Sequence, residues 1–176
     1  MEPTTKSSAI NNGLYLGGIL SLVTVLIYAI NLDLFTKWWL GIILFVVVVA
    51  YGVLSSVKSR TILGGFISFK HAFTSYFITI AVGSLIATVV GIAIFTFIDP
   101  EAATYVNEQI LVVTKQTMER FGMPKEAMQA ALEEAAKNDN FSLGMQFKNF
   151  VFGLAFYSLI GLIVALIVKK TDNKEA

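Results

Sequence analysis

The chain has 176 residues, of which 56% are hydrophobic and 14% charged, and its mean hydropathy is +0.72. Soluble domains carry about 25% charged residues, so this composition indicates a single membrane domain over residues 1–176. The absence of cysteine excludes disulfides and Cys-type zinc sites, and one histidine excludes a multi-histidine metal site. With a net charge of +1, we expect no nucleic-acid partner.

Four apolar runs without acidic or basic residues follow one another at residues 13–30, 38–57, 72–98 and 150–168. A helix needs roughly 20 apolar residues to cross a membrane. The valines at 47–49 favour strands in water, but open strands in lipid leave backbone groups unpaired, and four such runs cannot close a barrel. A cleavable signal peptide is the alternative for the first run, which is longer than usual and lacks a small-x-small site before Asn31. The sequence predicts an all-α membrane protein with four transmembrane helices.

Basic residues gather on one side of these predicted helices. The segment between the second and third runs carries Lys58, Arg60 and Lys70 without an acid, whereas residues 99–149 hold most of the acidic residues. Because segments rich in Lys and Arg stay in the cytoplasm, we expect both termini to be cytoplasmic and residues 99–149 to lie outside.

This extracytoplasmic insertion is predicted to form a hairpin of two amphipathic helices. Asp99 and Pro100 are typical of a helix start, Gly122 of a break and Pro124 of a second start. Apolar residues recur at helical spacing and form a candidate periplasmic interaction face: Tyr105, Val106, Ile110, Val113, Met128 and Leu132. The two helices would pack on each other, on the membrane surface or on a partner.

The stretch GGFISFKHAF, residues 64–73, places the only histidine beside a lysine before the third predicted helix. Arg60, Lys70 and His71 are candidates for contact with an anionic lipid headgroup or an acidic partner, since lysine side chains can reach the headgroup region. The alternative interpretation is a charged elbow between two apolar helices, without a ligand.

Small residues spaced by four form a stripe along the third predicted helix: Ser75, Thr79, Gly83, Ala87 and Gly91. Shorter stripes mark the first and fourth predicted helices: Gly13, Gly17 and Ser21, and Gly153, Gly161 and Ala165. Such stripes let helix backbones approach closely. The facing helix would belong to the same chain, to a second copy in a homo-oligomer, or to another membrane protein.

No residue pattern predicts catalysis. Glu126 and Glu133 share a face of the second amphipathic helix, but nearby Lys125 and Lys137 favour a solvated surface over a pair of catalytic acids. Glycine-rich phosphate loops, Ser-His-Asp sets and HExxH motifs are absent. The predicted spans hold no Asp, Glu, Lys, Arg or His, which argues against proton-coupled transport. We therefore expect no enzyme activity, no cofactor and no metal.

Three short motifs occur in a characteristic order: ISFKHAF at residues 67–73, IDP at residues 98–100 and GMPKE at residues 122–126. Together they resemble the DUF4199 family, integral membrane proteins of Bacteroidota with unknown function. His71 departs from a position that is often acidic in that family. The resemblance implies a four-helix inner-membrane protein linked to cell-envelope glycan or lipid metabolism, and it implies no reaction.

These observations favour an accessory or scaffold protein that packs against partner membrane proteins. The alternative is a passive channel, or a transporter or binder of an anionic lipid-linked substrate. That alternative needs a polar cavity between the spans with Arg60, Lys70 and His71 at its inner mouth. Membrane lipids are expected partners in either case.

Overall fold

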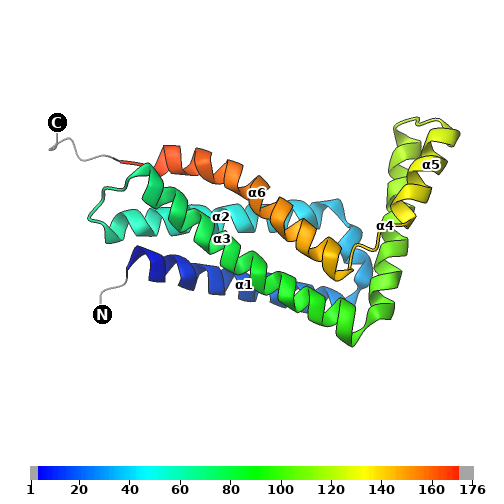
Figure 1. Cartoon of the computed structure of the whole chain (residues 1–176), viewed down its shortest axis with the longest axis horizontal. Coiled ribbons are helices and arrows are strands. Elements are labelled where there is room, and N and C mark those ends of the chain that lie inside the picture. Colours follow the sequence, from blue (N-terminus) through cyan, green and yellow to red (C-terminus); the bar gives the residue numbers. More distant parts are fainter. Residues whose placement is uncertain (1–3, 171–176) are drawn as a thin grey trace.

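The computed structural model describes residues 4–170, which form six α-helices and no strand (Figure 1). Four of them are long and apolar enough to cross a membrane: α1 (Thr5–Ile30), α2 (Trp38–Ile62), α3 (Phe69–Ile92) and α6 (Leu143–Val168). Two shorter, polar helices stand between α3 and α6: α4 (Pro100–Arg120) and α5 (Lys125–Ala136). A 3-10 turn, η1 (Leu32–Thr36), links α1 to α2, and a π-helical segment, η2 (Ala93–Ile98), prolongs α3.

The predicted helix signals between α3 and α5 are confirmed. The Asp99 carboxylate accepts a hydrogen bond from the Ala102 backbone N–H at 2.9 Å, and Pro100 is the first residue of α4. Gly122, with φ of +70°, ends α4, since a left-handed backbone is costly for any residue with a Cβ. Local chemistry therefore sets the limits of both polar helices.

The long helices extend beyond the apolar runs. α1 begins at Thr5 and α6 at Leu143, so polar residues such as Asn11 and Lys148 prolong the helices at their ends. Twenty-six residues span about 39 Å, more than the hydrocarbon layer of about 30 Å. The third run is not a uniform α-helix, because its last six residues widen into a π-helix in which the Asp99 N–H donates to the Ile94 carbonyl at 2.7 Å.

α3 lies at the centre of the four long helices and contacts α1, α2 and α6. Its Tyr76 is the largest fully buried side chain, and the ring sits between Gly52 of α2 and Gly161 of α6. A Cβ at either glycine would overlap the ring, so the helices meet here at the closest spacing that glycine permits. Leu16 and Ile80 complete this core.

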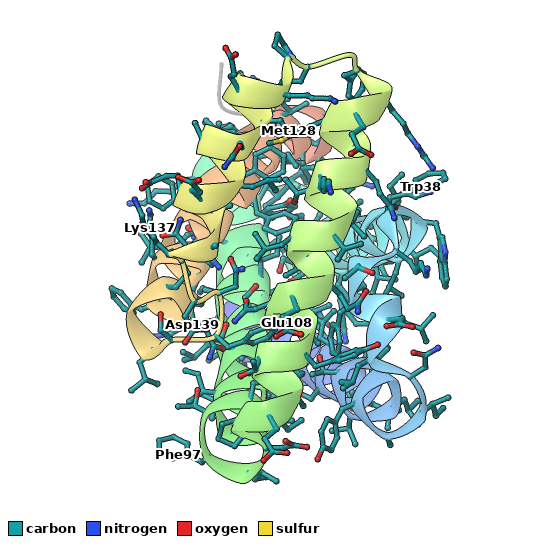
Figure 2. The ribbon with its side chains drawn as sticks, turned by 90° about the vertical axis from the view of Figure 1, so that its right-hand side faces the viewer. Trp38, Phe97, Glu108, Met128, Lys137 and Asp139 are labelled. Carbon is teal, nitrogen blue, oxygen red and sulfur yellow. The ribbon has the colours of Figure 1, made fainter. Side chains whose placement is uncertain are left out.

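The molecule has two different ends. At the end that we call the elbow end, Ile67 and Lys170 exchange two backbone hydrogen bonds of 3.0 Å, and His71 lies beside Lys6. At the opposite end, the arm end, α4 and α5 form an arm that lies across the ends of the long helices (Figures 1 and 2). An aromatic cluster attaches the arm there, with ring centroids of Phe95 and Phe141 4.5 Å apart and Ala102 and Ala103 of α4 buried against it.

Candidate functional site

The structure places the three charged candidates of the elbow in different surroundings. His71 is exposed, and its Nδ1 lies 2.9 Å from the Ser68 hydroxyl, which also caps α3 by accepting from the His71 backbone N–H. His71 lines a pocket of about 400 Å³ with Lys6, between the starts of α1 and α3, whereas Arg60 and Lys70 do not line it. The elbow is therefore a basic surface on which only His71 lines a pocket between two spans, and Arg60 and Lys70 lie outside that pocket.

The elbow-end part of the small-residue stripe on α3 is filled by neighbouring helices of the same chain. A Cβ at Gly83 would lie 2.7 Å from the Leu16 side chain of α1. The Thr79 hydroxyl lies 2.9 Å from the Ala9 carbonyl oxygen and 2.7 Å from the Ser55 hydroxyl, which itself donates to the Ser75 carbonyl at 3.2 Å. These contacts close the elbow-end half of the long helices around Thr79 and Gly83, whereas Ser75 borders the pocket that His71 lines.

The arm-end part of the same stripe borders open space. Ala87 lines a cavity of about 410 Å³ between the long helices, and a Cβ at Gly91 would have as its nearest neighbour only the Gln146 Oε1, at 3.5 Å. On the facing helix α6, nothing lies within 4 Å of a Cβ at Gly153, which also lines this cavity. The cavity therefore begins where the close packing of α3 and α6 ends.

Six polar side chains line this cavity, which we call the arm-end cavity: Ser84, Thr88, Asn140, Gln146, Asn149 and Tyr157. Its apolar wall comes from all four long helices and the α5–α6 loop: Leu20, Val48, Ala87, Phe141, Phe150, Gly153 and Leu154. No Asp, Glu, Lys, Arg or His lines it. The lining is thus a mixture of apolar and polar side chains, and none of those described is charged.

Several polar groups of the arm-end cavity have spare hydrogen-bonding capacity. Elsewhere in the long helices, the hydroxyl groups of Thr24 and Ser158 donate to the backbone carbonyl four residues earlier, at 3.0 and 2.7 Å, as helical Ser and Thr commonly do. The structure of residues 4–170 shows no such bond for Ser84, Thr88 or Tyr157. Gln146, in contrast, donates through Nε2 to the Phe141 carbonyl at 2.7 Å, which holds the mouth of the cavity together.

Sequence reasoning did not find this cavity. Ser84 and Thr88 were visible as polar residues within an apolar run, one turn apart on one helix face, and Gln146 and Asn149 precede the fourth run. The sequence therefore shows polar residues near the arm end of two different helices. Only the packing of α6 against α3 shows that these residues line the same cavity.

The structure does not bring the six predicted residues of the arm onto one exposed face. Val106 is 1% exposed and belongs to the attachment of the arm, and the Tyr105 hydroxyl donates to the Asp33 carboxylate at 2.7 Å. That hydrogen bond, with desolvation as a smaller cause, raises the pKa of Tyr105 above its ordinary value. Ile110 lines a small pocket near Asp139, and Val113 is exposed on its own.

Met128 and Leu132 lie in a groove between α4 and α5 with a volume of about 810 Å³, which we call the arm groove. Leu111 and Val112 of α4 form its other wall. Charged and polar residues rim it: Lys115, Glu119, Lys125, Gln129 and Glu133. Figure 2 shows Met128 between the two helices of the arm. Among the described residues, no three His, Asp or Glu side chains come together in a way that could hold a metal ion.

Comparison with known proteins gives one finding. A family model described as "Protein of unknown function (DUF4199)" matches residues 11–170, nearly the whole chain. Neither a curated protein nor a solved structure matches the chain.

Proposed function

The chain belongs to the DUF4199 family, and from this premise we propose that it is a non-enzymatic accessory protein of the inner membrane that holds a partner membrane protein through its arm groove. Four long apolar helices are consistent with a multi-pass membrane protein of unknown activity. The partner that fits the family resemblance is a membrane enzyme of cell-envelope glycan or lipid metabolism.

The distribution of charge supports an orientation with the elbow end in the cytoplasm. All nine Asp and Glu residues between residues 4 and 170 belong to the arm end. The charged residues at the elbow end in this same range are all basic: Lys6, Lys58, Arg60, Lys70, Lys169 and Lys170. Short basic segments are retained in the cytoplasm during insertion. Both termini are then cytoplasmic, and the arm is extracytoplasmic.

The single observation that carries the proposal is the arm groove. Helix α5 packs mainly on α4, so the groove between them keeps four apolar side chains without a covering element: Leu111, Val112, Met128 and Leu132. An amphipathic helix of a partner fits such a groove, because its apolar side chains at i, i+3/i+4 and i+7 would fill the space between α4 and α5. The rim carries both signs of charge, which suits a partner helix with mixed charges.

Photocrosslinking in native membranes tests the groove. With a photoreactive amino acid at Leu132, we expect one adduct of defined mass, and with the same residue at Ala130, on the exposed opposite side of α5, we expect none. Adding Met128→Lys should abolish the Leu132 adduct at an unchanged protein level, whereas Ala130→Lys should preserve it. Equal adducts from both positions, or an adduct that survives Met128→Lys, would contradict the proposal.

The orientation is testable separately, because the chain has no cysteine and any introduced thiol is unique. In intact spheroplasts, a membrane-impermeant maleimide should label the Lys115→Cys variant, while Lys58→Cys should react only after lysis. The reverse pattern would place the arm in the cytoplasm.

A further inference from the structure

We infer that the arm-end cavity is a binding site for an uncharged amphiphile whose head carries several hydroxyl groups, such as an alkyl glycoside or a monoacylglycerol. This site is distinct from the arm groove, so it can stand or fall independently of the proposed function. Its volume of about 410 Å³ lies within the range of small-ligand pockets.

The depth of the cavity calls for an amphiphile. Its lining on α6 runs from Gln146 to Tyr157, which is about 16 Å along the helix axis. It therefore reaches from the α5–α6 loop to near the middle of a hydrocarbon layer of about 30 Å. Asn140, Gln146 and Asn149 lie towards the mouth and Leu20 and Leu154 deeper, so a ligand would place its polar head outermost and its chain inside.

The polar lining calls for a head with hydroxyl groups. The hydroxyls of Ser84, Thr88 and Tyr157 can each donate and accept, and the Asn149 amide can do both as well. None of them has a protein partner among the described residues. Asn149 is exposed and the three hydroxyl-bearing side chains are half-buried, so their donors and acceptors are open to a ligand. A sugar or glycerol head offers several donors and acceptors on one small frame and can satisfy them together.

The uncharged lining favours a neutral head over an anionic one inside the cavity. No cationic side chain lines it, and the basic residues Lys6 and Lys70 belong to the opposite end of the long helices. A phosphate drawn into this space would lose its hydration without a counter-charge. The sequence-based expectation of an anionic lipid at the elbow therefore does not describe this cavity.

Thiol protection tests the site directly. The Gly153→Cys variant, reconstituted in phosphatidylcholine nanodiscs without alkyl glycoside detergent, places the only thiol of the chain in the open part of the cavity. We expect octyl glucoside below its micelle concentration, monooleoylglycerol, or both, to slow its maleimide labelling saturably, at least fivefold. The Phe152→Cys variant, at the neighbouring exposed position, is the control and should show no protection.

Three further variants separate binding from folding. Gly153→Leu fills the cavity and should abolish the rise in unfolding temperature that the amphiphile causes, whereas Gly18→Leu, also in open space but outside the cavity, should retain it. Ser84→Ala with Thr88→Val should weaken binding at least tenfold. If only the glucoside protects the Gly153→Cys thiol, the site prefers a sugar head. If only the acylglycerol protects it, the site prefers a glycerol head, and protection by both indicates a general polyol site. No protection, equal protection by dodecanol or phosphatidylglycerol, or binding that survives Gly153→Leu would overturn the inference.

Discussion

The two halves of the long-helix assembly use the same small residues for opposite purposes. At the elbow-end half, Gly52 and Gly161 bring α2 and α6 onto the Tyr76 ring, and Gly83 brings α3 onto Leu16. At the arm-end half, Gly153 and Gly91 meet little or nothing, and a polar cavity takes the place of the core. A small residue thus permits close packing only where a large side chain faces it, whereas Gly153 borders the arm-end cavity instead.

This contrast also bears on whether the long helices could enclose a channel. The elbow-end half is closed by Tyr76 and by the hydroxyl contacts of Thr79 and Ser55, so the cavity does not continue through the described structure as a pore. A passive channel would require Tyr76 to leave its place between two glycines. The packing therefore favours a binding protein or an accessory protein over a channel.

The largest expected effect is at Tyr76. Tyr76→Ala should destabilise the protein by about 3–5 kcal/mol, because it removes the largest buried side chain and leaves a cavity where three helices meet. Tyr76→Phe keeps the ring and removes a hydroxyl without a protein partner, so it should cost little or be slightly stabilising. Thermal unfolding in detergent measures both, and equal losses would contradict the central role given to the ring.

The second effect compares two glycines on one helix, Gly161 and Gly153, which are eight residues or about two turns apart. Gly161→Ala forces a methyl group into the Tyr76 ring and should cost about 1–3 kcal/mol. Gly153→Ala meets nothing within 4 Å and should stabilise by up to about 1 kcal/mol, since alanine favours helices. Shifts of the same sign in the unfolding midpoints would remove the distinction between the two halves.

The third effect compares two threonines of α3. Thr79→Val removes the hydroxyl that lies between Ala9 and Ser55 and should cost about 1 kcal/mol, a typical value for one hydrogen bond. Thr88→Val removes a hydroxyl without a protein partner in the cavity and should leave the unfolding midpoint of the ligand-free protein unchanged. A loss for Thr88→Val as large as for Thr79→Val would show that Thr88 has a structural role.

The sequence was sufficient for the long helices and for the limits of the arm. Hydropathy over about 20 residues shows the four apolar segments. Pro100 and Gly122 set a helix start and a helix end within one turn of their own positions. These features are local, so each is readable without knowledge of the partner helices.

The cavity and the exposed face of the arm were not readable in this way. Gly153 and Gly161 look alike in sequence and differ only in whether Tyr76 faces them. Val106 and Val113 lie on the same stripe of α4, yet Val106 is buried and Val113 is 37% exposed, because only the first part of α4 packs on the aromatic cluster. Such differences depend on tertiary packing, which periodicity alone does not contain.

The smallest expected effect concerns the attachment of the arm, where the Tyr105 hydroxyl donates to Asp33. The folded state raises the pKa of Tyr105 above the ordinary value of 10.0, so this contact contributes fully below pH 10 and is lost as the pH rises through the higher folded-state pKa. Above that point the phenolate has no proton to donate and stands beside a carboxylate. The unfolding midpoint of the wild-type protein should therefore fall more steeply as the pH rises above 10 than the midpoint of Tyr105→Phe. Tyr15 also has an exposed ring but no hydrogen bond to an acid among the described residues, so Tyr15→Phe is the matched control and should keep the wild-type slope. Parallel profiles for the wild type and Tyr105→Phe would mean that the aromatic cluster alone holds the arm.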